Sequence, residues 1–261
     1  MKDGSEGIGD LHIKGISGEL RKNLTSFYTE RNRSTVFELL ENSKTNLDVL
    51  FPEKDEGEFQ KIRERILIEQ ISLFCKSAED LGAFMFSLQN SSDISEFSDY
   101  LEDYHESEVD SLYRKFVDEE QEELEPLISD ILNMPEKSEI EARTDVGYSE
   151  KEDVREKVLK TYSKFYRKIN SIGKLYLEYK GFYRAYKHGY RVGTVGIEKQ
   201  GDQVKENTAL FYIYDRKENY ISITDRRIED IGALISDSDS LIKLLKDNFE
   251  TKERPLFTWI E

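Results

Sequence analysis

Residues 158–190 read VLKTYSKFYRKINSIGKLYLEYKGFYRAYKHGY and form the most regular apolar pattern of the chain. Apolar and aromatic residues recur in steps of four and three, which is the spacing of one face of an α-helix. The pattern predicts a single helix from Ser149 to about His188, roughly 60 Å long at 1.5 Å per residue. The members of this seam are Val158, Tyr162, Phe165, Ile169, Ile172, Tyr176, Tyr179, Tyr183, Tyr186 and Tyr190.

A second seam of the same spacing runs through residues 58–88. Additional apolar residues widen its face, which indicates a helix that is buried from several sides. We expect this central helix to pack against the long helix that begins at Ser149. The seam consists of Leu67, Ile71, Phe74, Ala78, Leu81, Met85 and Leu88.

The helical spacing stops near residue 196. Residues 209–214 and 220–224 are β-branched and aromatic, and the polar residues 215–219 between them predict a hairpin turn. Residues 226–249 return to helical spacing, and residues 256–260 are a candidate edge strand. The predicted fold is mainly α: a helical bundle with long helices plus a small C-terminal α/β appendage of a β-hairpin and a helix. We expect a flexible arm over 1–16, the bundle over 17–195, and the appendage, packed on the bundle, over 196–261.

Between these parts the sequence predicts shorter elements. A helical pattern from Ser17 ends before Pro52, because proline cannot continue a helix. Residues 94–104 and 109–133 predict two acidic helices, and residues 135–147 a surface connection. The single cysteine excludes an internal disulfide, and its apolar neighbours predict a buried thiol. No apolar run is long enough for a signal peptide or a membrane span, so we expect a cytoplasmic protein without membrane contact.

Charge is distributed unevenly along the chain. Residues 157–191 carry ten Lys or Arg and one acid, a net charge of +9, whereas the whole chain carries −16, which leaves −25 on the other residues. Residues 96–125 carry thirteen acids and two basic residues, a net charge of −11. An acidic protein attracts nucleic acid only locally, so the basic helix is where a function is expected.

The end of the basic helix gathers residues that can act on a phosphodiester. Lys180, Arg184, Lys187, His188 and Arg191 follow one another within three turns of the predicted helix. A histidine among cations suits proton removal from a hydroxyl next to a phosphate, and arginine can balance the developing charge. Tyr183 and Tyr190 on the adjoining stripe can stack on unpaired bases.

A purely structural interpretation explains the same residues. The tyrosine seam has the periodicity of a core, and the cations can neutralise the acidic run of residues 96–125 within the molecule. His188 near a helix end suits the helix dipole as a C-terminal cap.

EQISLFCKSAEDLGAF in the central helix, followed by YRAYKHG in the late helix, resembles the layout of the all-α HEPN superfamily. The resemblance covers about residues 18–195. Three residues separate Arg184 and His188, where the family motif usually has four to six. Active members of the family are metal-independent ribonucleases, many of them in defence and toxin systems. The resemblance implies His188 as the base, Arg184 as the stabiliser of phosphate charge, and single-stranded RNA as the partner.

The chain can be a non-catalytic interaction or scaffold module that holds a protein partner through its acidic helices or hairpin, and a homodimer is compatible with the sequence. A metal site is not expected, because the Glu-x-x-His step of di-iron bundles occurs once, at Glu102 and His105, and no other histidine repeats it. No cofactor motif is present.

Overall fold

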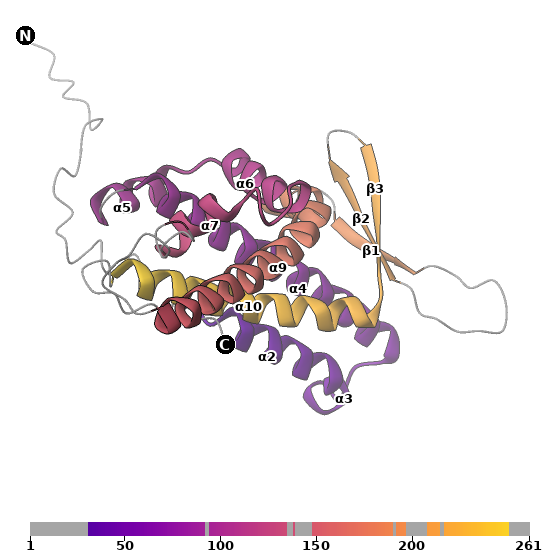
Figure 1. Cartoon of the computed structure of the whole chain (residues 1–261). Helices are drawn as coiled ribbons and strands as arrows, with labels where there is room; N and C mark the ends of the chain where they lie inside the picture. The colour runs from indigo at the N-terminus through magenta and orange to yellow at the C-terminus, as the bar shows by residue number, and fades with distance from the viewer. Residues whose placement is uncertain are drawn as a thin grey trace, which may run out of the picture.

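The computed structural model describes residues 31–91, 94–134, 138, 148–189, 192–196, 208–214 and 217–250. The predictions for residues 1–16, for most of the 135–147 connection and for the 256–260 strand lie outside these residues. Seen in Figure 1, helices form the body and a small sheet projects from one end. The elements are α2 (Arg33–Thr45), α3 (Leu47–Leu50), α4 (Glu56–Asn90), α5 (Ile94–Asp103), α6 (Glu106–Asp118), α7 (Glu125–Leu132), α9 (Tyr148–Lys187), β1 (Val192–Gly196), β2 (Thr208–Tyr214), β3 (Lys217–Ile223) and α10 (Asp225–Glu250).

The two long seams fold as predicted. Helices α4 and α9 are each continuous, and they contact one another within the bundle. A capping box starts α4: the backbone N–H of Glu58 donates to the Asp55 carboxylate at 2.9 Å, and Glu58 accepts from the Asp55 N–H. Every seam residue of α9 from Val158 to Tyr183 is at most 5% exposed. The seam is therefore the core face of the helix, and Tyr190 lies outside the described residues.

Tyr113 of α6 marks the point where three helices approach most closely. Its hydroxyl donates to the carbonyl of Ala78 on α4 at 2.6 Å. Its ring lies against two glycines, Gly82 of α4 and Gly173 of α9, where an added Cβ would come within 3.0 and 2.9 Å of the ring. At Gly82 that atom would also lie 2.5 Å from a methyl group of Val109. Only glycine permits this spacing.

Gly82→Ala is expected to lower the free energy of unfolding by about 1–3 kcal/mol, because the added methyl overpacks a filled core. Urea unfolding followed by circular dichroism measures this change. Gly57→Ala on the exposed first turn of α4 is the control, since a Cβ there meets only the Asp55 side chain at 3.3 Å. An unfolding midpoint for Gly82→Ala equal to that of the native chain would contradict the close packing.

The acidic region differs from the prediction in one respect. The first acidic helix is found as α5, but the predicted helix over residues 109–133 is divided into α6 and α7. Pro126 lies in the first turn of α7. Because proline has no backbone N–H, it fits the first turn of a new helix and not the interior of a longer one. The helix predicted to end before Pro52 is likewise divided, into α2 and α3, at Asn46.

The C-terminal part contains the predicted sheet and helix, with two differences. Strand β2 pairs antiparallel with β3 from Thr208↔Ile223 to Tyr214↔Lys217, so two residues rather than five connect them. A third strand, β1, pairs with β2 and begins before the predicted boundary at residue 196. Phe182 of α9 packs edge-on against Tyr212 of β2, with ring centroids 6.0 Å apart. This contact places the sheet at the carboxyl end of α9.

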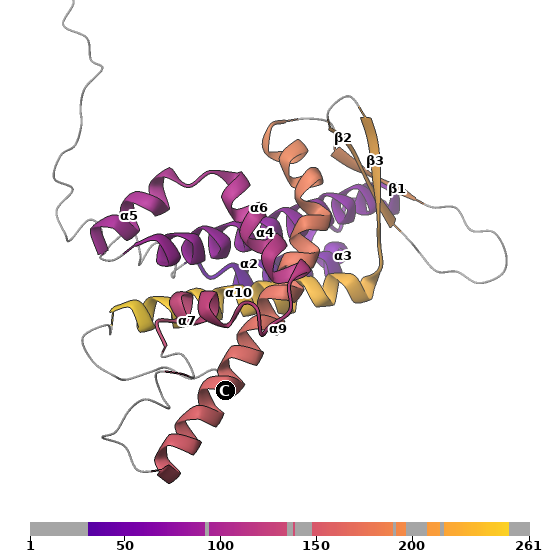
Figure 2. The same ribbon diagram turned by 45° about the horizontal axis from the view of Figure 1, so that its top comes forward.

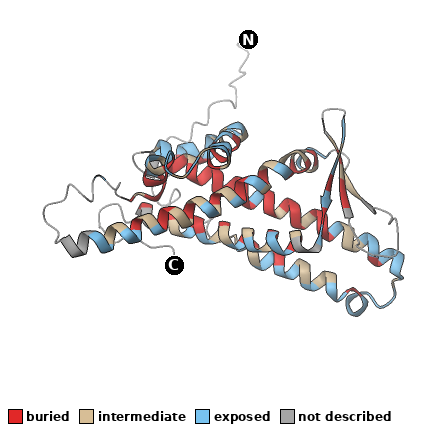
Figure 3. Cartoon of the chain, turned by 45° about the vertical axis from the view of Figure 1, so that its right-hand side comes forward, coloured by how far each residue is buried: buried red, intermediate tan, exposed pale blue. Residues whose placement is uncertain are grey.

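Helix α10 belongs to the main body. It contacts α4 and α2 more extensively than α9, and its buried isoleucines and leucines join the same core as α4 and α9. Figure 3 shows the buried face of the helices as a continuous layer. Cys75 of α4 lies inside this layer with no exposed surface, as expected, and burial raises the pKa of its thiol.

Candidate functional site: the basic face of α9

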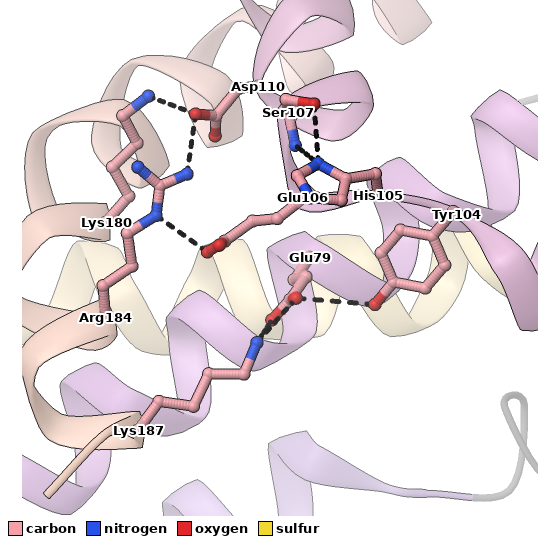
Figure 4. Close-up of polar contacts among 9 residues, drawn as sticks. All are labelled: Glu79, Tyr104, His105, Glu106, Ser107, Asp110, Lys180, Arg184 and Lys187. Carbon is pink, nitrogen blue, oxygen red and sulfur yellow. Dashed lines mark hydrogen bonds and ion pairs between the residues drawn. The ribbon is translucent and has the colours of Figure 1, made fainter.

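The carboxyl end of α9 faces acids of α4 and α6. Lys180, Arg184 and Lys187 form one stripe of α9, and Glu106 and Asp110 are one turn apart at the start of α6. In Figure 4 the three basic side chains point toward these carboxylates and toward Glu79 of α4. These three cations, which were predicted to contact RNA, therefore form ion pairs within the protein.

The first contact group contains two cations and two carboxylates. Lys180 Nζ lies 2.5 Å and Arg184 Nη2 lies 3.0 Å from Asp110 Oδ2, and Arg184 Nε lies 3.0 Å from Glu106 Oε1. The side chains of Lys180, Asp110 and Arg184 are 15%, 13% and 21% exposed. Burial acts to lower the pKa of Arg184, but the hydrogen bond and charge of Glu106, together with Asp110, raise it overall. Arg184 thus stays fully charged and is held by α6.

The second group is formed around Glu79, whose side chain is only 7% exposed. Lys187 Nζ donates to its two carboxylate oxygens at 2.9 and 3.2 Å, and the hydroxyl of Tyr104 donates to it at 3.4 Å. The same ammonium lies 5.2 Å from the centroid of the Tyr183 ring. That ring is 5% exposed, so the base-stacking role predicted for Tyr183 is not supported by its position. Burial, and then Glu79, raise the pKa of the Tyr183 hydroxyl.

His188 follows the last turn of α9 and is exposed. Its backbone N–H donates to the carbonyl of Arg184 at 3.1 Å. Tyr190 and Arg191 lie outside the described residues. The structure therefore brings Lys180, Arg184 and Lys187 together with carboxylates, and it does not leave the Arg184 guanidinium turned toward solvent as a phosphate ligand.

The acidic residues that pair with these cations could have been recognised from the sequence. Glu79 interrupts the apolar run of the central helix, and an acid at such a position requires a partner. The four-residue step from Glu106 to Asp110 matches the step from Lys180 to Arg184. His105 also has a role other than metal binding: its ring Nδ1 accepts from the Ser107 N–H at 3.2 Å and so caps α6.

A different part of α9 presents cations to solvent. Between residues 157 and 174 the helix has six Lys or Arg and no acid. Four of them are exposed and form no ion pair with any residue that the structure describes. In Figures 2 and 3 the amino-terminal part of α9 extends past the neighbouring helices. We call these four residues the outer stripe; they are Lys157, Lys160, Arg167 and Lys174.

The two flanks of the outer stripe differ in charge. On one flank the hydroxyl of Tyr166 donates to the carbonyl of Glu119 at 2.9 Å. Glu119 is followed in the sequence by further acids in the connection between α6 and α7. Burial, and then Glu120 and Glu122, raise the pKa of this hydroxyl. On the other flank α10 lies alongside, and Lys168 pairs with its Asp237. The acids of the α6–α7 flank therefore repel a polyanion.

No protein-family model matches this chain, and no curated protein or solved structure matches it either. Within the part of the chain that the structure describes, no helix has the length and apolar character to span a membrane. The same residues contain no group of three or more His, Cys, Asp or Glu side chains that could hold a metal ion.

Proposed function

We propose that the chain is a non-catalytic binding module that holds single-stranded RNA on the outer stripe of α9. The observation that carries the proposal is the exposure of Lys157, Lys160, Arg167 and Lys174 without ion pairs, in a protein whose net charge is −16. Cations that form no ion pair neutralise phosphates without first giving up a carboxylate partner.

The spacing of the outer stripe favours binding of a single RNA strand over binding of a duplex. Lys160, Arg167 and Lys174 are seven residues apart, so they lie on nearly the same line of the helix, about 10 Å from one another. A flexible strand can follow such a line, whereas the acids of α6 and α7 would oppose a wide, rigid duplex.

Cleavage is not part of the proposal. The catalytic role implied by the HEPN resemblance needs Arg184 to stabilise a phosphate that gains charge. Glu106 contacts its Nε and Asp110 its Nη2, each at 3.0 Å, and these carboxylates would repel an incoming phosphate. Binding without cleavage is the function that this geometry supports best.

The test is fluorescence anisotropy with a labelled eight-nucleotide uridine RNA at several salt concentrations. Four phosphate contacts predict a slope of about −3 in the logarithm of the association constant against that of salt. The triple variant Lys160→Gln, Arg167→Gln, Lys174→Gln should bind about tenfold or more weakly and have a slope near −1. Glutamine keeps the helix, since its helix propensity is close to that of lysine.

The control removes the same charge elsewhere. Lys61, Lys217 and Lys243 are exposed on α4, β3 and α10, and their change to glutamine should leave affinity and slope unaltered. An equal loss of RNA affinity in both triple variants would show that only net charge matters and would refute the outer stripe as the RNA-binding site. The RNA should remain uncut after incubation with the native chain; cleavage that His188→Ala abolishes would instead support the ribonuclease.

A further inference from the structure

A groove of about 590 Å³ lies between α9 and α10, and Lys174, the last member of the outer stripe, is part of its wall. The groove is therefore continuous with the surface on which the RNA strand is proposed to lie. Apolar side chains, among them Leu175 and Leu234, line it together with charged groups from both helices.

Two of these charged groups are fixed and two are not. Arg227 of α10 pairs with Glu178 of α9, and its guanidinium carbon lies 5.8 Å from the centroid of the Tyr179 ring. This arrangement holds the guanidinium as a cation–π partner within the groove wall. Lys174 of α9 and Asp230 of α10 both line the groove and are exposed, and neither forms an ion pair with a residue that the structure describes.

An unpaired ammonium and an unpaired carboxylate that line the same groove suit a ligand that has both a negative group and a pair of hydrogen-bond donors. A carboxylate only accepts hydrogen bonds, so it favours an edge on which donors are adjacent. Among the RNA bases, guanine alone presents two adjacent donors, N1–H and the N2 amino group, on its Watson–Crick edge. Adenine and cytosine place an acceptor beside their amino group, and uracil places carbonyl acceptors beside its single N–H.

We infer that this groove accepts one unstacked guanine of the bound strand, with Asp230 accepting from N1–H and N2 and Lys174 contacting the adjoining phosphate. The inference rests on the proposed function, because the outer stripe holds the strand that delivers the base. The apolar side chains Leu175 and Leu234 cover the face of the base, and the fixed guanidinium of Arg227 offers it a stacking surface.

The experiment compares three labelled octamers in the same anisotropy assay: eight uridines, seven uridines with a 3′-terminal guanine, and seven uridines with a 5′-terminal guanine. The native chain should prefer one guanine octamer by about tenfold, the discrimination typical of a two-donor contact to a base edge. Asp230→Asn should abolish this preference, because an amide places a donor against the guanine donors. Binding of the uridine octamer should not change. Glu229→Gln, which removes the same charge from an exposed neighbour on α10, should keep the preference.

Failure of this inference can be distinguished from failure of the proposed function. Binding of the uridine octamer with no preference for either guanine octamer would refute the guanine site in the groove but would still support RNA binding by the outer stripe. A preference that survives in Asp230→Asn would also refute the guanine site. No binding of any octamer would refute the proposed function together with the groove. Free GMP should compete at least about tenfold more weakly than the guanine octamer, and equal competition would show a mononucleotide site instead.

Discussion

Asp80→Ala is expected to lower the free energy of unfolding by about 3–5 kcal/mol, the usual effect of breaking a buried ion pair. Asp80 lies on α4 with its side chain 7% exposed, and its Oδ2 contacts the guanidinium groups of Arg31 and Arg33. The Arg33 side chain is only 4% exposed. Removing the carboxylate takes away the negative charge that Asp80 places against this buried cation, in a place that water reaches poorly. Urea unfolding at pH 7 measures the change.

Two further variants separate the ion pair from other effects. Asp118→Ala changes an exposed carboxylate at the end of α6 and should leave the unfolding midpoint where it is. The double variant Arg33→Met, Asp80→Leu should be more stable than Asp80→Ala, since replacing both partners by apolar groups leaves no buried charge. A single variant as stable as the native chain would show that Arg33 does not depend on Asp80.

Unfolding at alkaline pH is the second large effect. Burial raises the pKa of Tyr113, Tyr176 and Tyr183 well above the ordinary value of about 10. Above pH 10 the unfolded chain loses these phenolic protons while the folded chain keeps them, so stability falls as pH rises. Each such tyrosine lowers the free energy of unfolding by about 1.4 kcal/mol per pH unit, and the three together lower it by about 4 kcal/mol per pH unit. Cooperative unfolding is expected between pH 10 and 12, with tyrosinate absorbance at 295 nm and loss of helical circular dichroism occurring together.

Tyr176→Phe tests the cause directly. The Tyr176 hydroxyl is buried and has no hydrogen-bond partner among the described residues, so phenylalanine keeps the packing and removes the titrating proton. The alkaline midpoint should move to higher pH, without a loss of stability at neutral pH. Tyr220→Phe changes a tyrosine that is 59% exposed and should not move the midpoint. A rise near pH 10 that corresponds to all fifteen tyrosines while the helices persist would contradict the burial of these hydroxyls.

The structural assignments that succeeded from sequence depend on local spacing. The 4, 3 seams of α4 and α9 specify both the helices and the faces that are buried, because a helix places residues three and four apart on one side. The missed boundary between α6 and α7 also had a local cause, since Pro126 permits a helix start and not a helix interior. The strand β1 was missed because its five residues, with two glycines, become a strand only by pairing with β2.

The candidate site could be located only in part. The charge count of residues 157–191 indicated α9, on which the proposed outer stripe also lies, but three of the cations chosen within it, Lys180, Arg184 and Lys187, form ion pairs within the protein. The members of the outer stripe lie about two to six turns before Lys180. Sequence alone placed both sets on the same basic helix without distinguishing them.

The sequence by itself determined that this protein is built on two long helices with an aromatic core face, and that its positive charge lies on the later of them. Those properties follow from the order of residues along one element. Which cations are neutralised was decided by the tertiary structure, because α6 and α4 bring Asp110, Glu106 and Glu79 against one end of α9 from positions 70 to 108 residues away. The direction of each side chain is a local property, whereas the group that it meets depends on how distant helices pack.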